Sequence, residues 1–232
     1  MEAILAGRLR SWAEKYNNPE YFKEDPIAFP RLFANKGACL QDIEVAAVFA
    51  AHFAWGRRSM IVRDCTRLFD EMSWHPYDYV MRGCWRCDNS SAHRTVRWSE
   101  VAAICVRLRD LYSKAPSLET LDAPDMRTAV FGQKEDPKAA NKKIHMMRRW
   151  MVRSDGIVDL GLWKDTDPAS LIIPLDVHVY EEASALGLTT RRSKDYATAL
   201  QITDAFREIW PQDPCLGDFA LFGYGIDKGK DA

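Results

Sequence analysis

Residues 42–56, DIEVAAVFAAHFAWG, constrain the fold more than any other segment of the chain. Asp42 is a residue type favoured at the start of helices, and Gly56 is one that commonly ends them. Between them almost every residue is apolar, so no side of this helix is suited to water. Such a helix is stable at the centre of a bundle, where other helices cover it. We therefore expect residues 42–55 to be mostly buried.

Further segments predict helices, because apolar residues recur in them at intervals of three and four. They comprise residues 1–16, 59–72, 99–114, 193–210 and 213–225. Ser99, Ser193 and Asp213 are the expected N-caps, and Pro214 suits the first position of a helix. The alternation of apolar and polar residues that is typical of strands is nowhere convincing. The sequence predicts an all-α fold with no sheet larger than a short hairpin.

The size and composition of the chain indicate a globular protein. With 232 residues, 47% of them hydrophobic and 28% charged, it can bury the core of one large domain or of two small lobes. No apolar run approaches the roughly 20 residues that a membrane helix needs. The N-terminal stretch MEAILAGRLRSWAEKY predicts an amphipathic helix and not a secretory signal. We expect a cytoplasmic protein without a membrane partner, and the oligomeric state is left open.

The cysteines are scattered, and only Cys84 and Cys87 are close in sequence. A single Cys-x-x-Cys pair is a weak signal for zinc or for redox chemistry. His93 could add a third metal ligand, but no residue supplies a clear fourth. The alternative is a set of free thiols in a reducing compartment. We favour free thiols, and we expect neither a metal nor a cofactor.

Residues 138–153, KAANKKIHMMRRWMVR, contain no acid, although the net charge of the whole chain is only −1. A helix advances about 100° per residue, which gathers basic side chains within a stripe about 80° wide. This cationic row comprises Lys138, Lys142, His145, Arg149 and Arg153. Ala140, Ile144, Met147 and Met151 lie opposite, so the helix is predicted to bury one face and expose the row. Such a row either binds phosphate groups or is simply solvated.

A loop with glycines and aspartates follows the basic segment and leads to an aspartate at the head of a helix. The loop contains Gly156, Gly161 and Lys164. The apolar run LIIPL then ends at Asp176, and the residues after it have helical spacing as far as Gly187. Asp176 is therefore predicted to be an N-cap, which accepts hydrogen bonds from the first free N–H groups of the helix. A carboxylate in this place could also take part in chemistry.

A basic helix, a glycine-bearing turn, a lysine, an apolar run with proline and Asp-Val-His-Val follow one another in residues 138–179. This order resembles the helix-hairpin-helix DNA glycosylase superfamily, the endonuclease III class. Residues 175–188, LDVHVYEEASALGL, are similar to the segment in which that superfamily carries its essential aspartate. Residues 217–225, GDFALFGYG, look like its closing helix. The same blocks look like an uncharacterised bacterial family distantly allied to these glycosylases.

The resemblance implies an all-α, two-lobed fold with a cleft between the lobes. One lobe is expected to comprise residues 37–173 and to end in the hairpin. The other is expected to join residues 1–36 to residues 174–232, which leaves Asp176 at the cleft.

Two features depart from the superfamily pattern. Gly156 and Gly161 are five residues apart, so the hairpin is degenerate and Lys164 stands in a displaced register. Some members hold an iron–sulfur cluster through cysteines near the C-terminus. Cys215 is the only cysteine after residue 182, and we therefore expect no iron–sulfur cluster.

The resemblance also implies DNA base-excision repair, in which the N-glycosidic bond of a damaged base is cleaved. Asp176 would stabilise the positive charge that develops on the sugar, or would activate water. Lys164 would be the amine that attacks the sugar and forms a Schiff base, which would add AP lyase activity. Lys142 and Lys143 are the alternative candidates for the attacking amine.

The partner that this function requires is a DNA duplex, with or without a lesion. Its backbone is expected to contact Lys138, Lys142, Lys143, Arg149, Arg153, Gly156 and Gly161. A flipped base would enter a pocket lined by Trp150, Trp163 and Phe131, unless these side chains pack in the core. Two alternatives stay open. One is a catalytically silent nucleic-acid-binding protein in which Asp176 is only a cap, and the other is a helical interaction protein.

Overall fold

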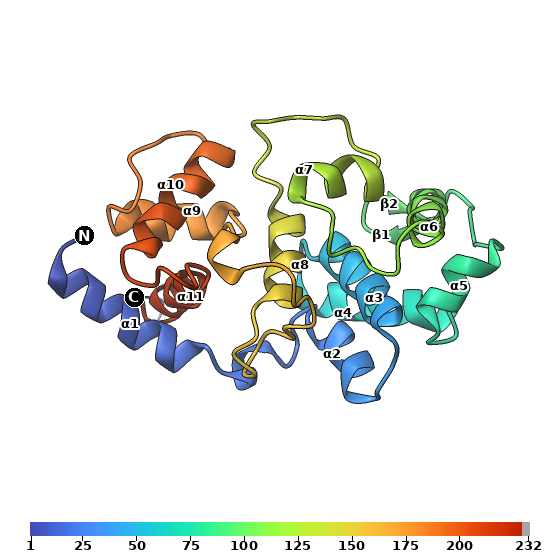
Figure 1. The fold of residues 1–232 in the computed structure, drawn as a ribbon, viewed down its shortest axis with the longest axis horizontal. Coiled ribbons are helices and arrows are strands. Elements are labelled where there is room, and N and C mark those ends of the chain that lie inside the picture. The colour runs from blue at the N-terminus through green and yellow to red at the C-terminus, as the bar shows by residue number, and fades with distance from the viewer. Residues whose placement is uncertain (229–232) are drawn as a thin grey trace. The chain divides into compact units, whose positions relative to one another are not determined.

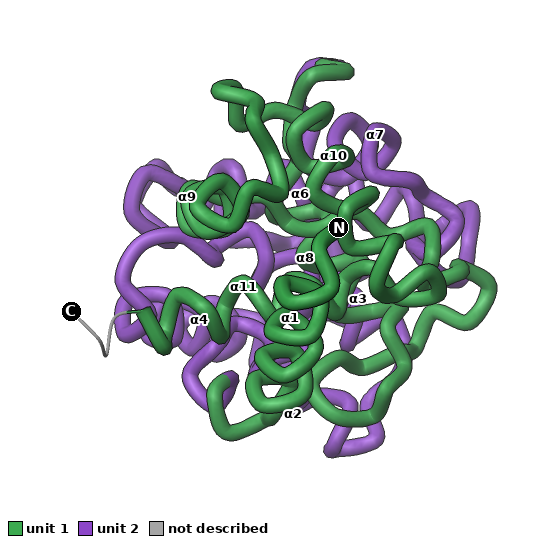
Figure 2. The backbone as a smooth tube through the Cα atoms, turned by 90° about the vertical axis from the view of Figure 1, so that its left-hand side faces the viewer, with its two compact units in different colours: residues 1–21, 136–232 green, residues 22–135 purple. Residues whose placement is uncertain are grey.

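The structure of the chain, a computed structural model, describes residues 1–228 and divides into two compact units (Figure 2). Unit 1 comprises residues 1–21 together with the chain from residue 136 onward, and unit 2 comprises residues 22–135. Among the described residues, helices dominate and one two-stranded hairpin is the only sheet (Figure 1). The predicted all-α class is confirmed.

Unit 2 is built around helix α3. Its elements are α2 (Ala28–Asn35), α3 (Leu40–Phe53), α4 (Arg58–Glu71), α5 (Pro76–Arg82), β1 (Ser91–His93), β2 (Val96–Arg97), α6 (Trp98–Tyr112), α7 (Ala123–Asp125) and a π-helical turn at Met126–Val130. The helix α3 packs against α2, α4 and α5, and the antiparallel β1–β2 hairpin packs against α4 and α6.

Helix α3 is buried along almost its whole length. The side chains from Val45 to Ala51 are at most 1% exposed. Glu44 is also 1% exposed, and its carboxylate accepts hydrogen bonds from the Tyr112 hydroxyl at 2.9 Å and the Ser117 hydroxyl at 2.6 Å. These bonds replace the hydrogen bonds to water that burial removes. The burial predicted for this segment is confirmed.

Unit 1 gathers helices from both ends of the chain. Its elements are α1 (Ala3–Tyr16), most of a 3-10 turn (Pro19–Phe22), α8 (Lys142–Val152), a second 3-10 turn (Pro168–Ser170), α9 (Val177–Ala185), α10 (Tyr196–Arg207) and α11 (Leu216–Lys228). The helix α1 packs against α11, which also packs against α9 and α10 (Figure 1). A Cβ at Gly223 of α11 would come 2.2 Å from the Tyr16 ring, so this close approach requires glycine.

The observed division, like the predicted one, joins the N-terminal helix to the C-terminal helices. The two divisions differ in two segments. Residues 22–36 were expected in the lobe of the chain termini but lie in unit 2, and residues 136–173 were expected in the other lobe but lie in unit 1. As a result, α8 and the loop after it belong to the same unit as Asp176. Within residues 1–228, no helix combines the length and the apolar character that crossing a membrane needs.

Candidate functional site

Helix α8 is buried on almost every side, which corrects the prediction of an exposed cationic row. Eight of its eleven residues are buried. His145, Arg149 and Arg153 of the row are 4%, 5% and 1% exposed. Ile144 and Met147, on the opposite side, are buried as well. Lys138 precedes α8, which begins at Lys142, so this member of the predicted row does not lie on the helix. Most of the remaining row is directed into unit 1.

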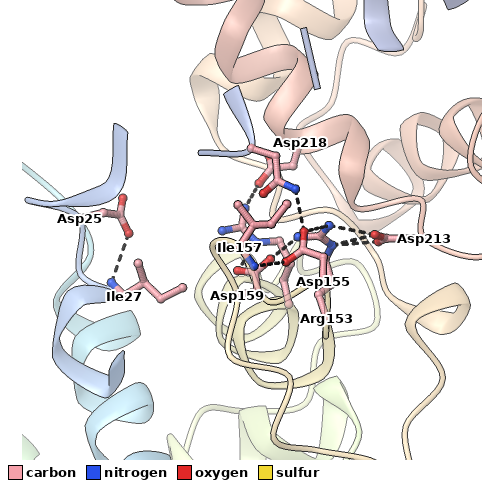
Figure 3. Close-up of polar contacts among 10 residues, drawn as sticks. Asp25, Ile27, Arg153, Asp155, Ile157, Asp159, Asp213 and Asp218 are labelled. Atoms are coloured by element: carbon pink, nitrogen blue, oxygen red, sulfur yellow. Dashed lines mark hydrogen bonds and ion pairs between the residues drawn. The ribbon is translucent and has the colours of Figure 1, made fainter. Parts of the chain in front are cut away.

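Three aspartates surround the guanidinium group of Arg153 (Figure 3). Its Nε lies 2.9 and 3.0 Å from the two carboxylate oxygens of Asp213. Its Nη2 donates to Asp155 at 2.8 Å, and its Nη1 donates to Asp159. A buried guanidinium needs such partners, because an unpaired charge away from water costs several kcal/mol.

Arg149 extends the same network by one helical turn. Its Nε lies 3.3 Å from Oδ1 of Asp159, and its Nη1 donates to Asp218 in the first turn of α11. Both arginines also lie against the ring of Phe219, at 4.7 and 5.0 Å from its centroid. The network thus connects α8 to the following loop and to α11 (Figure 3).

This network changes the role of Arg149 and Arg153. Because carboxylates already bind their guanidinium groups, these residues are not the DNA-backbone contacts that the sequence predicted. The side chain of Asp218 is 12% exposed, and the loss of contact with water raises its pKa to about 6 against the opposite effect of Arg149. The negative charge of Asp176 adds to the rise of this pKa. Asp176 is therefore coupled electrostatically to the network.

The loop after α8 closes the C-terminal end of that helix. The N–H groups of Leu160 and Gly161 donate to the Trp150 carbonyl at 2.7 and 3.2 Å. Gly161 has a φ of +59°, and a Cβ there would lie 2.5 Å from the Cα of Ser154. Its N–H group is hydrogen-bonded to the last turn of α8 and is therefore not available for the phosphate expected there. Gly156 also has a positive φ, and a Cβ there would meet no atom within 4 Å.

The three aromatic residues predicted to line a base pocket are buried. Trp150, Trp163 and Phe131 are 0%, 1% and 8% exposed. Phe131 belongs to unit 2, where its ring stacks on His52 with 5.5 Å between centroids. The three side chains pack in the cores of the two units and form no wall of an open pocket, which corrects that prediction.

Asp176 lies where the buried run 171–175 meets α9, and its two carboxylate oxygens have different surroundings. Oδ1 accepts a hydrogen bond from the Val179 N–H at 2.9 Å, so Asp176 is the N-cap that the sequence predicted. Oδ2 lies 3.9 Å from Nζ of Lys142, at the start of α8. The side chains of Lys142 and Asp176 are 31% and 38% exposed, so solvent reaches both. A carboxylate and an amine are thus accessible side by side.

Lys142 is the amine that the structure places beside Asp176. Lys164, the first choice from the sequence, is exposed and forms no hydrogen bond or ion pair with any residue between 1 and 228. Lys138 is exposed and Lys143 is half-buried. These two lysines and Lys142 are therefore the predicted DNA-binding cations that solvent reaches.

A family model described as a protein of unknown function, DUF2400, matches residues 25–130 and 123–227. The chain belongs to this family. The second matched segment contains α8, Asp176 and the aspartates that bind Arg149 and Arg153. No curated protein and no solved structure matches the chain.

Sequence reasoning missed the aspartates that surround α8. Asp155 and Asp159 follow the basic segment directly, and this closeness was a signal that its charges could be paired locally. Asp213 and Asp218 gave no such signal, because they lie 60 and 69 residues after the arginines they bind. Only the fold brings them to α8.

The cysteines of this DUF2400 chain are free thiols. Cys39, Cys84 and Cys87 are exposed, and Cys65, Cys105 and Cys215 are buried. Among the residues that the structure describes, no group of three or more His, Cys, Asp and Glu side chains is placed to hold a metal ion. The site is therefore considered as a set of side chains only.

Proposed function

We propose that the chain cleaves N-glycosidic bonds in nucleic acid, with Asp176 as the carboxylate that acts at the sugar. The observation that carries this proposal is the position of Asp176. One oxygen caps α9, and the other lies 3.9 Å from Nζ of Lys142 in a side chain that is 38% exposed. The substrate class comes from the resemblance of residues 175–188 to the aspartate segment of helix-hairpin-helix DNA glycosylases. A damaged base in a DNA duplex is the substrate that this resemblance favours.

The chemistry suits a carboxylate. When the bond between the base and C1′ breaks, its electron pair leaves with the base, which takes up a proton, and positive charge develops on the sugar. Water then adds its hydroxyl group to C1′ and gives up its other proton. Asp176 can stabilise the cationic sugar and can accept that proton. Oδ2, the oxygen near Lys142, can fill these roles while Oδ1 accepts the capping hydrogen bond from Val179.

Lys142 offers a second route, which would add AP lyase activity. Its uncharged amine would attack C1′ and displace the base, which leaves with the electron pair and a proton. The sugar ring then opens to give an imine between Nζ and C1′, from which the 3′ phosphate can be eliminated. Lys142 replaces Lys164 in this proposal because of its distance to Asp176.

A catalytically silent nucleic-acid-binding protein is the second candidate, and one observation favours it. The hydrogen bond from Val179 to Asp176 accounts for an aspartate at this position without any chemistry. The two candidates therefore differ in what Asp176 does beyond capping.

Base release from a panel of lesion-containing duplexes separates the candidates. The variant is Asp176→Asn, and the matched control is Asp195→Asn. Asp195 caps α10 of the same unit by accepting a hydrogen bond from the Thr198 N–H at 3.0 Å. Asparagine also caps well, so both variants should stay folded. We expect Asp176→Asn to lose base release and Asp195→Asn to keep it. Equal rates in the two variants, or no release by the wild type from any lesion, would favour the silent candidate.

Borohydride trapping tests the lyase route. Reduction of the imine would join the protein covalently to a DNA strand that carries an abasic site, because only an amine forms such an adduct. We expect Lys142→Gln to abolish the adduct and Lys164→Gln to leave it unchanged. The reverse result would return the role to Lys164. Base release without any adduct would restrict the activity to hydrolysis.

A further inference from the structure

A surface of unit 2 combines positive charge with an exposed tryptophan. It is formed by the link between α3 and α4, with the sequence Trp55-Gly56-Arg57-Arg58, and by Arg94 at the tip of the β1–β2 hairpin. We call these five residues the Trp55 patch. All of them are exposed, and Trp55 is 39% exposed. None of them belongs to the site around Asp176.

The Trp55 patch rests on a rigid base. His93 is fully buried beneath it, with one ring nitrogen 3.0 Å from the Trp55 carbonyl oxygen and the other 2.8 Å from Oδ2 of Asp64 in α4. The rings of His93 and Trp55 also pack edge to face, with 5.5 Å between centroids. These contacts fix the interhelical link and the hairpin to each other, so a ligand would meet a preformed surface.

The guanidinium group of Arg94 lies over the ring of the exposed tryptophan. Its guanidinium carbon lies 4.5 Å from the centroid of the Trp55 ring. A Cβ at Gly56 would come 2.6 Å from Nη1 of Arg94, so glycine leaves the space that the guanidinium occupies. Arg94 itself has a φ of +51°, an unfavourable value for a residue with a side chain. Strain of this kind persists where the surrounding structure enforces it.

The charges of the Trp55 patch are not neutralised within the described part of the chain. Arg57, Arg58 and Arg94 form no ion pair with any residue between 1 and 228. No acid occurs in residues 45–63, and the first turn of α4 contains none. Arg63 and Arg67 lie farther along α4 and share one carboxylate, that of the buried Asp64. The N–H groups at the start of α4 add to the positive potential.

We propose that the Trp55 patch binds a single strand of nucleic acid. A base would stack on the layer formed by Trp55 and Arg94, since aromatic rings and guanidinium planes both stack on unpaired bases. The phosphates on either side of that base would contact Arg57 and Arg58 and the first N–H groups of α4. The strand must be unpaired at this point, because the faces of paired bases are covered by their neighbours in the duplex.

The chemistry of the patch favours a strand over other anionic partners. A membrane surface would require several apolar side chains to enter the lipid, and Trp55 is the only large apolar residue of the patch. An acidic peptide would pair with the arginines but would make no use of the Trp55 ring and the guanidinium group that covers it. A nucleic acid strand uses both features at once.

Fluorescence anisotropy with a labelled single strand of about 16 nucleotides tests the proposal on the full chain. We expect Trp55→Ala to weaken binding about tenfold, through loss of base stacking, and Trp55→Phe to restore most of it. Arg57→Gln combined with Arg58→Gln should lower the slope of log Kd against log salt by about 1.4, because each phosphate contact contributes about 0.7. The control, Arg82→Gln combined with Lys114→Gln, removes two exposed cations elsewhere in unit 2 and should change neither value.

Three results would overturn this inference. One is unchanged binding in the Trp55 and Arg57/Arg58 variants. The second is binding of poly-glutamate that Trp55→Ala weakens as much as it weakens binding of the strand. The third is binding of anionic lipid vesicles that Trp55→Ala weakens to the same extent. Asp195→Asn, which changes a helix cap of unit 1 outside the proposed site, should bind the strand as the wild type does. A chain that binds the strand through the patch but releases no base would therefore refute the proposed activity and leave this inference standing.

Discussion

Helices α3 and α8 are each buried within their own unit, but by different means. The sides of α3 are apolar almost all round, and hydrophobic burial, which needs no particular direction, stabilises it. The helix α8 carries Arg149, and Arg153 follows its last residue; both are buried against aspartates in fixed geometry. The comparison shows that the burial of α3 depends on its own residues, whereas the burial of α8 depends on carboxylates from other parts of unit 1.

The largest expected effect comes from removing a charge at the end of α8. Arg153→Met should lower the free energy of unfolding by about 3–5 kcal/mol, because it leaves Asp213 without its buried partner and the buried Asp159 with Arg149 alone. Urea denaturation measures the loss. Arg82→Met, which removes an arginine that is 56% exposed in its pair with Asp78, should cost less than about 1 kcal/mol. Similar small losses in both variants would mean that the two helices are stabilised in the same way.

A smaller effect is expected from the protonation of Asp218. Its pKa is 3.8 when unfolded and about 6 when folded, so between these values the folded state holds a proton that the unfolded state has lost. Asp218 therefore stabilises the fold fully below pH 4, and this contribution is lost as the pH rises from about 4 to 6. The loss should be on the order of 2 kcal/mol and should disappear in Asp218→Asn, as measured by urea denaturation over this pH range.

The contribution of His145 to stability should depend on pH in the opposite direction, so His145 serves as a control. Burial lowers its pKa from 6.5 to about 4, so the unfolded state binds a proton more readily. Its contribution to stability is present above pH 6.5 and is lost as the pH falls toward 4. His145→Gln should therefore change the pH dependence in the direction opposite to Asp218→Asn. If both variants changed the pH dependence of stability in the same direction, the opposite pKa shifts of Asp218 and His145 would be contradicted.

The smallest effect is expected in α3. Val48→Ala should lower the free energy of unfolding by about 1.5 kcal/mol, because it removes two buried methyl groups from a fully covered side chain. Val106→Ala, at a position of α6 that is 50% exposed, should cost less than about 0.5 kcal/mol. If both cost the same, α3 is not the hydrophobic core that its sequence indicates.

The starts of the helices show how far the sequence could predict the fold. The cap at Asp176 was predicted correctly, because a polar side chain there follows a buried run and precedes helical spacing. Asp42 was not a cap: α3 begins at Leu40, and Asp42 instead accepts a hydrogen bond from the Tyr77 N–H at 2.9 Å. This backbone partner lies 35 residues away, which no local pattern reveals.

The candidate site shows the same limit. The sequence identified Asp176 from its local pattern, but it could not choose between Lys142 and Lys164, because that choice depends on how α8 packs against the start of α9. It also predicted a phosphate-binding role for Arg149 and Arg153, since a run of cations looks the same whether water or buried carboxylates face it. Such contacts between distant residues follow from the packing of unit 1.

The most direct test of the account measures the rate of base release and the stability of the same variant. Asp176→Asn should lower the single-turnover rate by at least about 100-fold, through lost stabilisation of the cationic transition state. Its free energy of unfolding should change by less than about 1 kcal/mol, because asparagine keeps the cap. A variant that loses stability in proportion to activity, or that releases base as fast as the wild type, would show that Asp176 is only the cap of α9.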